Sequence, residues 1–348
     1  MKRTSRAFYL SLRFLPRSTR APIALAYALA RTADTIADHA ALPAGTRARE
    51  LEAFLASLSR PGSKAALPAE VVQAVPSPDE RELLSHLGEH IDLLWTLAAE
   101  DRERVTHLLG TIVQGMLLDL SWFGLATSET PVALPSRVDL DRYCYHVAGA
   151  VGEFWTRMQE AHIPRFAKRP VPDLLPAAVR FGKGLQLTNV LRDLPRDLAL
   201  GRSYLPAEDL ARLGLVPADL LDPGALPRVR PLVVELVQVA IEHCLAGMAY
   251  TLALSRRQLR LRFSCALPLL MAVETLGLVA ASPDLLRREV FLKITRRRVL
   301  ALARDSLVAA PSDGALAAVF RRILRRAGFA EAARGPFNVT PLGSARSN

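Results

Sequence analysis

The chain has 348 residues, of which half are hydrophobic and only 6% aromatic, so it can bury the core of one large domain or two average ones. Alanine and leucine are abundant and lose little side-chain freedom in a helix, which favours an all-α fold. The formal charge of +11 indicates an anionic partner, such as a membrane face or a phosphorylated substrate, or else an arginine-rich solvated surface. No basic stripe interleaved with aromatic residues occurs, so nucleic acid is not the expected partner.

Helical periodicity runs through nine segments, which Pro- and Gly-rich stretches separate. These segments are residues 21–40, 47–58, 79–97, 102–122, 140–161, 174–198, 228–254, 263–279 and 295–307. No run with the period-two alternation of a strand is present, and neither a repeat nor a long polar linker divides the chain. We therefore predict one all-α domain of roughly ten helices over residues 1–332, followed by a disordered tail over residues 333–348.

The basic N-terminus lacks a convincing cleavage site for a signal peptide. The longest apolar run, residues 263–281, contains Pro268 and Glu274, so it predicts a buried core helix rather than a membrane span. Three widely spaced cysteines in apolar segments predict buried free thiols in a reducing compartment: Cys144, Cys244 and Cys265. Together these features predict a cytoplasmic protein.

The first motif with chemical content lies near the end of the segment 21–40. It reads Arg31-Thr-Ala-Asp34-Thr-Ile-Ala-Asp38, so its two carboxylates share one helix face, with the arginine one turn earlier. Two carboxylates spaced this way repel each other unless a cation lies between them. Alone, the motif would indicate no more than a polar helix face.

A second motif makes the pattern specific. Asn189, Asp193 and Asp197 recur every four residues, with Arg192 adjoining them, and Pro195 is expected to end or bend this helix. Carboxylates together with substrate phosphates are the usual ligands of Mg²⁺, and arginine binds phosphate oxygens directly. Two such stripes facing each other inside a helical bundle would hold metal-bound diphosphate.

Several blocks in this order resemble the squalene/phytoene synthase family, the head-to-head trans-prenyltransferases. They are residues 4–8, 31–38, 143–153, 186–197 with 201–206, and 265–272 with 290–294. The Asp-Thr-Ile-Ala-Asp form of the first acidic motif and the C-terminal blocks are similar to squalene synthases. The resemblance implies a single-domain isoprenoid synthase bundle with a central apolar cavity. Family members usually carry a further helical segment before the first block, so a misassigned start of the chain is one expectation.

The resemblance also implies roles for individual residues. Those implied to be catalytic are Tyr143, Asp34, Asp38, Asp193 and Asp197. The implied Mg²⁺ ligands are Asp34, Asp38, Asn189, Asp193 and Asp197. The positions implied to contact the substrate diphosphates are Ser5, Arg6, Arg31, Gln186, Asn189, Arg192 and Arg202. Gly149 and Gly152 would let an isoprenoid chain lie against a helix, whereas Tyr145 is expected to be an ordinary buried tyrosine with a satisfied hydroxyl.

The implied reaction joins two farnesyl diphosphates through a cyclopropyl diphosphate, which NADPH then reduces to squalene. A glycine-rich dinucleotide fingerprint is absent, so NADPH use rests on the resemblance, with Lys293 and Arg296 as its phosphate contacts or simply as a solvated helix face. Ser264 stands where squalene synthases usually carry an aromatic residue. Dehydrosqualene, hydroxysqualene and phytoene synthases, which do not use NADPH, are therefore alternatives.

Two readings from other classes compete with a synthase. His86-Leu-Gly-Glu89-His90 fits a zinc-hydrolase pattern, although Gly88 weakens a helix there and no third ligand is evident. A non-catalytic family relative acting as an assembly protein would be expected to lose metal ligands, and all five are present. The implied product is a C30 hydrocarbon and the surface of the protein is basic. We therefore also expect peripheral contact with the inner face of an anionic membrane.

Overall fold

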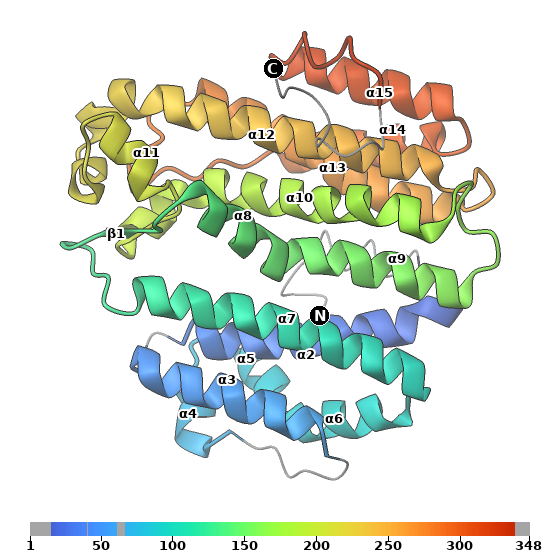
Figure 1. Ribbon diagram of the computed structural model, residues 1–348, viewed down its shortest axis with the longest axis horizontal. Helices are drawn as coiled ribbons and strands as arrows, with labels where there is room; N and C mark the ends of the chain where they lie inside the picture. The colour runs from blue at the N-terminus through green and yellow to red at the C-terminus, as the bar shows by residue number, and fades with distance from the viewer. Residues whose placement is uncertain (1–14, 40, 61–66, 338–348) are drawn as a thin grey trace, which may run out of the picture. The chain divides into compact units, whose positions relative to one another are not determined.

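The structure is a computed structural model that describes residues 15–39, 41–60 and 67–337. The predicted positions Ser5 and Arg6 lie outside these residues. The described chain is almost entirely helical, which confirms the all-α prediction (Figure 1). It divides into two compact units, one ending at Leu125 and including Arg157–Ile163, the other formed by Ala126–Thr156 and the chain from Pro164 onward. Each unit is described by itself, and the single domain over residues 1–332 stays a prediction.

Unit 1 is built around two long helices, α2 and α7, which pack side by side. Its helices are α2 (Arg17–Ala37), α3 (Ala44–Leu58), α4 (Ala69–Gln73), α5 (Pro78–Ser85), α6 (Leu87–Thr96) and α7 (Ala99–Phe123). The start of α5 follows from sequence, because Pro78 is its first residue and the Ser77 side chain accepts a hydrogen bond from the Glu80 N–H at 3.4 Å. Helix α5 also packs against α2. This packing brings an acidic first turn toward the first acidic motif.

Unit 2 contains the remaining elements. They are β1 (Val132–Ala133), α8 (Arg137–Cys144), the π-helical turn η1 (Tyr145–Gly149), α9 (Ala150–His162, whose last turns belong to unit 1), α10 (Val171–Ala199), β2 (Arg202–Ser203), α11 (Ala207–Arg212), the 3₁₀ turns η2 (Pro217–Leu221) and η3 (Pro223–Ala225), α12 (Leu226–Ala253), α13 (Leu259–Ala281), α14 (Arg296–Ala309) and α15 (Asp313–Arg326). Figure 1 shows α10, α12 and α13 running alongside one another, and these three helices make the core of the unit.

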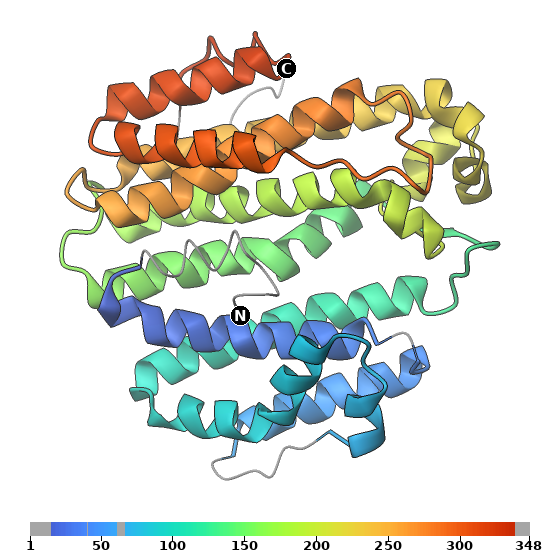
Figure 2. The same ribbon diagram turned by 180° about the vertical axis from the view of Figure 1, so that it is seen from behind.

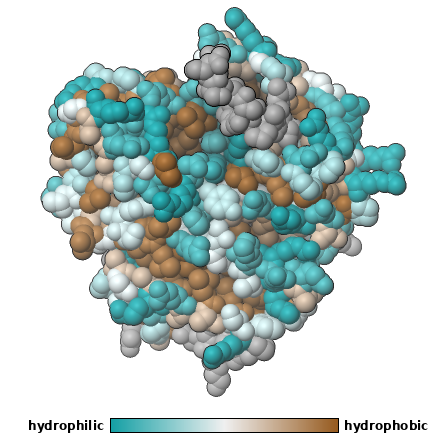
Figure 3. Space-filling model, viewed as in Figure 1, coloured by the Kyte–Doolittle hydropathy of each residue, from teal (hydrophilic) through white to brown (hydrophobic). Residues whose placement is uncertain are grey.

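Helices α12 and α13 are long and apolar enough to cross a membrane, but more than half of each apolar window is buried within the protein. The run 263–281 therefore forms a core helix, as predicted. Figure 3 shows hydrophilic side chains over much of the face it draws, with smaller hydrophobic patches between them. All three cysteines are free and buried, as expected from their apolar surroundings.

The elements differ from the predicted segments in several places. The segment 79–97 divides at His86 into α5 and α6, and the segment 140–161 is interrupted by η1, so the described residues hold more helices than the ten expected. No strands were expected, but the structure contains two short ones, β1 and β2, which pair in parallel. Helix α15 was not predicted, although Ser312 caps it by accepting a hydrogen bond from the Ala315 N–H at 3.2 Å.

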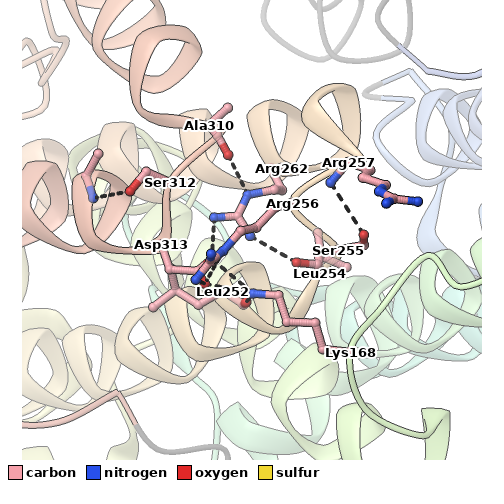
Figure 4. Close-up of polar contacts among 11 residues, drawn as sticks. Lys168, Leu252, Leu254, Ser255, Arg256, Arg257, Arg262, Ala310, Ser312 and Asp313 are labelled. Carbon is pink, nitrogen blue, oxygen red and sulfur yellow. Dashed lines mark hydrogen bonds and ion pairs between the residues drawn. The ribbon is translucent and has the colours of Figure 1, made fainter.

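Helix α15 is fastened to the rest of unit 2 at its first residue, Asp313 (Figure 4). Its carboxylate accepts hydrogen bonds from Lys168 at 2.9 Å, from Arg256 at 2.8 Å and from Arg262 at 2.8 Å. Burial alone would raise the pKa of Asp313, but these three cations outweigh it and lower the pKa to about 2. The carboxylate is therefore charged at any physiological pH.

Arg262 joins this cluster from α13 and has no exposed surface. Its Nε donates to the Ala310 carbonyl oxygen at 2.6 Å and its Nη1 to the Leu254 carbonyl oxygen at 2.9 Å. One guanidinium thus satisfies backbone acceptors just beyond α14 and α12 as well as the aspartate of α15. Farther along, Ala333 is buried and the Phe337 ring lies 5.7 Å from that of Phe320, so the chain still packs on α15 there, while residues 338–348 are outside the described part.

Candidate active site

The first acidic motif, residues 31–38, covers the last two turns of α2 and the residue after them, in unit 1. Arg31 donates from Nη1 to Asp34 Oδ2 at 2.5 Å and from Nη2 to Glu80 Oε1, on α5, also at 2.5 Å. Asp38 is the residue after the last helical one, and its N–H donates to the Asp34 carbonyl oxygen at 2.9 Å. Asp34 therefore lies in the last turn of α2 and Asp38 just beyond it, so that a shared helix face for their side chains stays a prediction, while Glu80 is a partner that the local pattern did not indicate.

The charge on Arg31 is fixed by these two carboxylates. Burial would lower the pKa of its guanidinium, but Asp34 and Glu80 outweigh that effect and the pKa is raised. The Asp34 side chain keeps 40% of its surface exposed, so it remains accessible despite its ion pair.

The second acidic motif lies in unit 2, within α10. Asn189, Asp193 and Asp197 all belong to this helix, which continues through Pro195 and ends only at Ala199. The expectation that Pro195 ends the helix is therefore wrong; Pro lacks one N–H, but the packing of α10 between its neighbours keeps the helix intact. The three oxygen-bearing side chains thus follow one uninterrupted helix at the predicted spacing.

Arg192 forms an ion pair with Asp193, the middle residue of this stripe. Its Nε donates to Asp193 Oδ1 at 2.8 Å, and its Nη2 donates to Asp193 Oδ2, so the two groups form a two-pronged pair. Each side chain keeps 35% of its surface exposed. Both acidic motifs therefore share one arrangement, an arginine held by an aspartate that is still open to solvent.

A tight turn follows the second motif and positions Arg202. Gly201 has a φ of +76°, and a Cβ at that position would lie 2.0 Å from the Thr127 carbonyl oxygen, so the backbone approaches too closely for another residue. Strand β2 then pairs with β1, with Arg202 opposite Val132. This short pairing holds the backbone of Arg202 directly after the acidic stripe.

The central tyrosine block meets the same segment. The rings of Tyr143, in α8, and Tyr204, just after β2, stack with centroids 4.9 Å apart and planes inclined by 27°. Tyr204 is 7% exposed and Tyr143 is half-buried. The structure therefore brings together two blocks that are 61 residues apart, a pairing that no local sequence pattern indicates.

Close helix packing, rather than a ligand, accounts for Gly152. A Cβ there would lie 2.0 Å from the Ala178 carbonyl oxygen of α10, and a Cβ at Gly182 would lie 2.0 Å from the Ala148 carbonyl oxygen of η1. The α10 backbone thus explains the close approach inferred at Gly152, and an isoprenoid chain lying against this helix stays a prediction. The close approach inferred from a glycine in an apolar helix is real, but it is between two helices.

Tyr145, one turn from Gly149, behaves as expected. Its hydroxyl donates to Glu153 Oε2 at 3.3 Å. Partial burial and then the Glu153 charge raise the pKa of Tyr145, so the phenol stays protonated at neutral pH. Burial also raises the pKa of each of the three cysteine thiols to about 12, so none is a thiolate nucleophile.

The remaining predicted positions lie elsewhere in the described chain. Lys293 and Arg296 are exposed, the first in the loop before α14 and the second at its start, and Ser264 and Cys265 are buried in α13. Within the described residues, no group of three or more His, Cys, Asp or Glu side chains is arranged to hold a metal ion. The His86 and Glu89 side chains of the zinc-hydrolase pattern approach no closer than 4.0 Å, and both are exposed.

Unit 2 also contains a small cavity of about 80 Å³ between α8, α10 and α12. Its walls include Asp141 and Cys144 from α8, Lys183 from α10 and His243 from α12. Small-molecule sites usually enclose about 300 Å³ or more, so this cavity is too small for a C15 chain. It is distinct from the acidic stripe of α10, and the central apolar cavity stays a prediction.

Comparison with known proteins decides the family. The family model described as squalene/phytoene synthase matches residues 1–298. The chain belongs to the squalene/phytoene synthase family. This is a prenyltransferase family whose members condense isoprenoid diphosphates head to head. The acidic motifs, the tyrosine block and β2 all fall within the matched residues.

Individual relatives agree with the family assignment. A presqualene diphosphate synthase of Rhodopseudomonas palustris is 30% identical, over 69% of this chain and 72% of that protein. The squalene synthase ERG9 of Gibberella zeae is 28% identical over 84% of this chain, but the match spans only 60% of its own length. The structure of TcSQS in complex with the ligand E5700 superposes with a TM-score of 0.75 at 22% identity, covering 95% of each chain, and so shares the fold.

Proposed function

We propose that this enzyme condenses two farnesyl diphosphates to a cyclopropyl diphosphate and then reduces that intermediate to squalene with NADPH. The observation that supports the condensation best is the repeated arrangement of an arginine beside an accessible aspartate, Arg31 with Asp34 and Arg192 with Asp193. Each pair offers a carboxylate to a cation and a guanidinium to a phosphate. Two diphosphates need two such places.

Mg²⁺ is the proposed metal, held by Asp34 and Asp38 on one helix and by Asn189, Asp193 and Asp197 on the other. The donor set fits, because all five offer hard oxygen ligands and both stripes keep exposed carboxylates. Bound there, the metal would neutralise the leaving diphosphate and ease cleavage of the allylic C–O bond. One motif supplies two carboxylates and the other supplies two carboxylates and an amide, so substrate phosphate oxygens would complete the coordination.

The protein's own groups would orient the substrates. Arg31, Arg192 and Arg202 would contact diphosphate oxygens, with Gln186, Ser5 and Arg6 as further polar contacts. Tyr143 is proposed to handle the proton lost in the first condensation, or to stabilise the cation with its ring, and its stacking on Tyr204 would fix that ring in place.

Fewer observations support the reduction by NADPH than support the condensation. Lys293 and Arg296 are the proposed contacts to the NADPH phosphates, and their exposure leaves them free to bind an anion from solvent. A second candidate activity ends at the cyclopropyl diphosphate. The similarity to a presqualene diphosphate synthase over most of both chains and Ser264 in place of an aromatic residue favour this candidate. Dehydrosqualene, hydroxysqualene and phytoene formation remain the other outcomes.

Product analysis separates these activities. The enzyme would be incubated with farnesyl or geranylgeranyl diphosphate and Mg²⁺, with and without NADPH, and the products extracted and identified. Squalene that forms only with farnesyl diphosphate and NADPH supports the full proposal. The cyclopropyl diphosphate under both conditions supports the second candidate, and phytoene from the C20 substrate would replace both. No condensation product under any condition would refute the synthase reading.

We also propose a cytoplasmic enzyme in peripheral contact with the inner face of an anionic membrane. The net positive charge and the insolubility of a C30 hydrocarbon support this proposal. Retention of all activity in the soluble fraction at low salt, with anionic vesicles present, would argue against it.

A further inference from the structure

Helix α14 presents one unusual surface. Its inward side is formed by Leu302, Ser306 and Ala309, which are buried where α14 packs on α13 and α15. The opposite side is solvent-exposed, and helical geometry places its members within about 120° of one another. We call this surface the α14 face; it consists of Arg297, Leu300, Arg304, Leu307 and Val308, all of them exposed.

The apolar members of the α14 face are unusually open. Leu300 is 69% exposed, Leu307 54% and Val308 75%, and Phe291, in the loop before the helix, is 73% exposed. Elsewhere in the described chain, exposed large hydrophobic residues lie more than ten residues apart in the sequence. A cluster of this kind loses free energy in water and indicates a surface that is covered in the working protein.

The charge around the cluster is strongly positive. Helices α14 and α15 together contain eight arginines and only two aspartates. Figure 2 shows the two helices side by side. One of the aspartates, Asp305, lies between them and pairs with Arg304 at 3.0 Å and with Arg322 at 2.5 Å, so it ties the two basic helices together. The other aspartate, Asp313, is paired with Arg262 at 2.8 Å at the start of α15.

We propose that the α14 face docks on the surface of an anionic lipid bilayer. Its leucine and valine side chains would enter the boundary between headgroups and acyl chains, while the arginines contact lipid phosphates. Charge complementarity selects this occupant, because an apolar strip on two helices with eight arginines and two aspartates suits an anionic surface better than a neutral protein groove. The inference deepens the membrane contact of the proposed function and assigns it to one helix.

The α14 face is also held in one conformation before it docks. The α14 face is held by a helix whose inner side is packed, and α15 beside it is fixed through Asp313 to three cations (Figure 4). No folding on the membrane is required, so the side chains that bind are already in place. Binding should therefore be fast, reversible and weakened by salt.

Vesicle co-sedimentation of the full chain tests the proposal. The vesicles would be phosphatidylcholine alone or phosphatidylcholine with phosphatidylglycerol. We expect the wild type to bind the anionic vesicles, to bind neutral ones far more weakly, and to dissociate as salt is raised. The double variants Leu300→Ser/Leu307→Ser and Arg297→Gln/Arg304→Gln should each weaken binding about tenfold, since each lipid contact contributes several-fold.

Matched controls carry the same chemical changes elsewhere. Leu93→Ser/Val216→Ser alters two exposed apolar residues, and Arg49→Gln/Arg60→Gln alters two exposed arginines, none of which belongs to α14 or α15. These controls should bind as the wild type does. Condensation of farnesyl diphosphate in detergent solution should be equal in all five proteins, which shows that each is folded. Lys293 and Arg296 are left unchanged because they are proposed cofactor contacts.

Several results would overturn the proposal. If the α14 variants bind anionic vesicles as tightly as the wild type, the surface is wrong although the membrane contact stands. If the wild type does not bind while it condenses substrate normally, the membrane contact itself fails and the proposed chemistry survives. A change in sedimentation velocity of the α14 variants without vesicles would identify the face as a contact with a second copy. Binding that requires removal of residues 338–348 would show that the chain covers its own face.

Discussion

Replacing Asp313 by asparagine should lower the stability of the protein by about 2 kcal/mol. In the folded protein Lys168, Arg256 and Arg262 hold the pKa of Asp313 at about 2, against about 3.9 in an unfolded chain. A difference of nearly two pKa units corresponds to about 2.5 kcal/mol, and the 27% exposure of the carboxylate reduces that figure somewhat. The amide keeps the shape of the side chain but removes the charge that balances the buried guanidinium of Arg262.

The pH dependence follows from the same shift. Because the folded-state pKa is lowered, the stabilisation is fully present above the unfolded pKa near 4 and is lost as the pH falls toward about 2. Urea unfolding of the wild type and the Asp313→Asn variant should therefore give a constant difference in free energy between pH 5 and 7. The two curves should converge below pH 4.

A matched control is Asp284→Asn. Asp284 pairs with Arg287 at 2.7 Å, but both side chains are about half exposed, so its loss should change stability by less than about 0.5 kcal/mol. The reasoning is refuted if Asp313→Asn costs no more than this control. It is also refuted if the difference from the wild type persists unchanged down to pH 3.

Three further predictions concern the active site and its support. Asp34→Asn and Asp193→Asn should each abolish turnover and leave urea unfolding unchanged within about 1 kcal/mol, since both carboxylates are partly exposed; full activity in both would contradict the metal proposal. Gly182→Ala should destabilise the protein by more than about 3 kcal/mol, because the new methyl group would meet a backbone oxygen at 2.0 Å. Gly110→Ala should instead stabilise α7 by up to about 1 kcal/mol, because nothing lies within 4 Å of the added methyl group. Lys293→Ala should raise the KM for NADPH about tenfold or more without slowing the first condensation, and an unchanged KM would remove this residue from the cofactor site.

Spacing predicted the acidic motifs well, because a four-residue repeat has a direct meaning on a helix. It predicted that Asn189, Asp193 and Asp197 share one helix, and the structure places all three in α10. Glu80 could not be predicted as the partner of Arg31, since the contact joins α2 to α5 across 49 residues. Contacts of this kind depend on how helices pack, which no short window of sequence specifies.

Other differences have different causes. Helix α15 carried a recognisable signal, a serine cap at Ser312 followed by buried Leu316, Phe320 and Ile323, but it falls in an arginine-rich stretch that is easily taken for a solvated end. The stacking of Tyr143 on Tyr204 and the close approach at Gly152 belong to tertiary packing. The glycine signalled that something lies close, but the sequence could not say whether it was a ligand or a helix.

The π-helical turn η1 lies between α8 and α9 and sets the rotational position of the α9 side chains relative to α8. A wider turn holds an additional residue, so the side chains after it are rotated relative to those of a uniform helix. Removing one residue from this turn would restore ordinary winding and leave α9 close to its present orientation, whereas removing a residue from the uniformly wound α9 would rotate the rest of the helix by about 100°. A deletion at residue 150 or 151 would then turn Gly152 away from Ala178 and drive a bulkier side chain against α10. Single-residue deletions between residues 145 and 149 should therefore be tolerated better than deletions at residues 150 and 151.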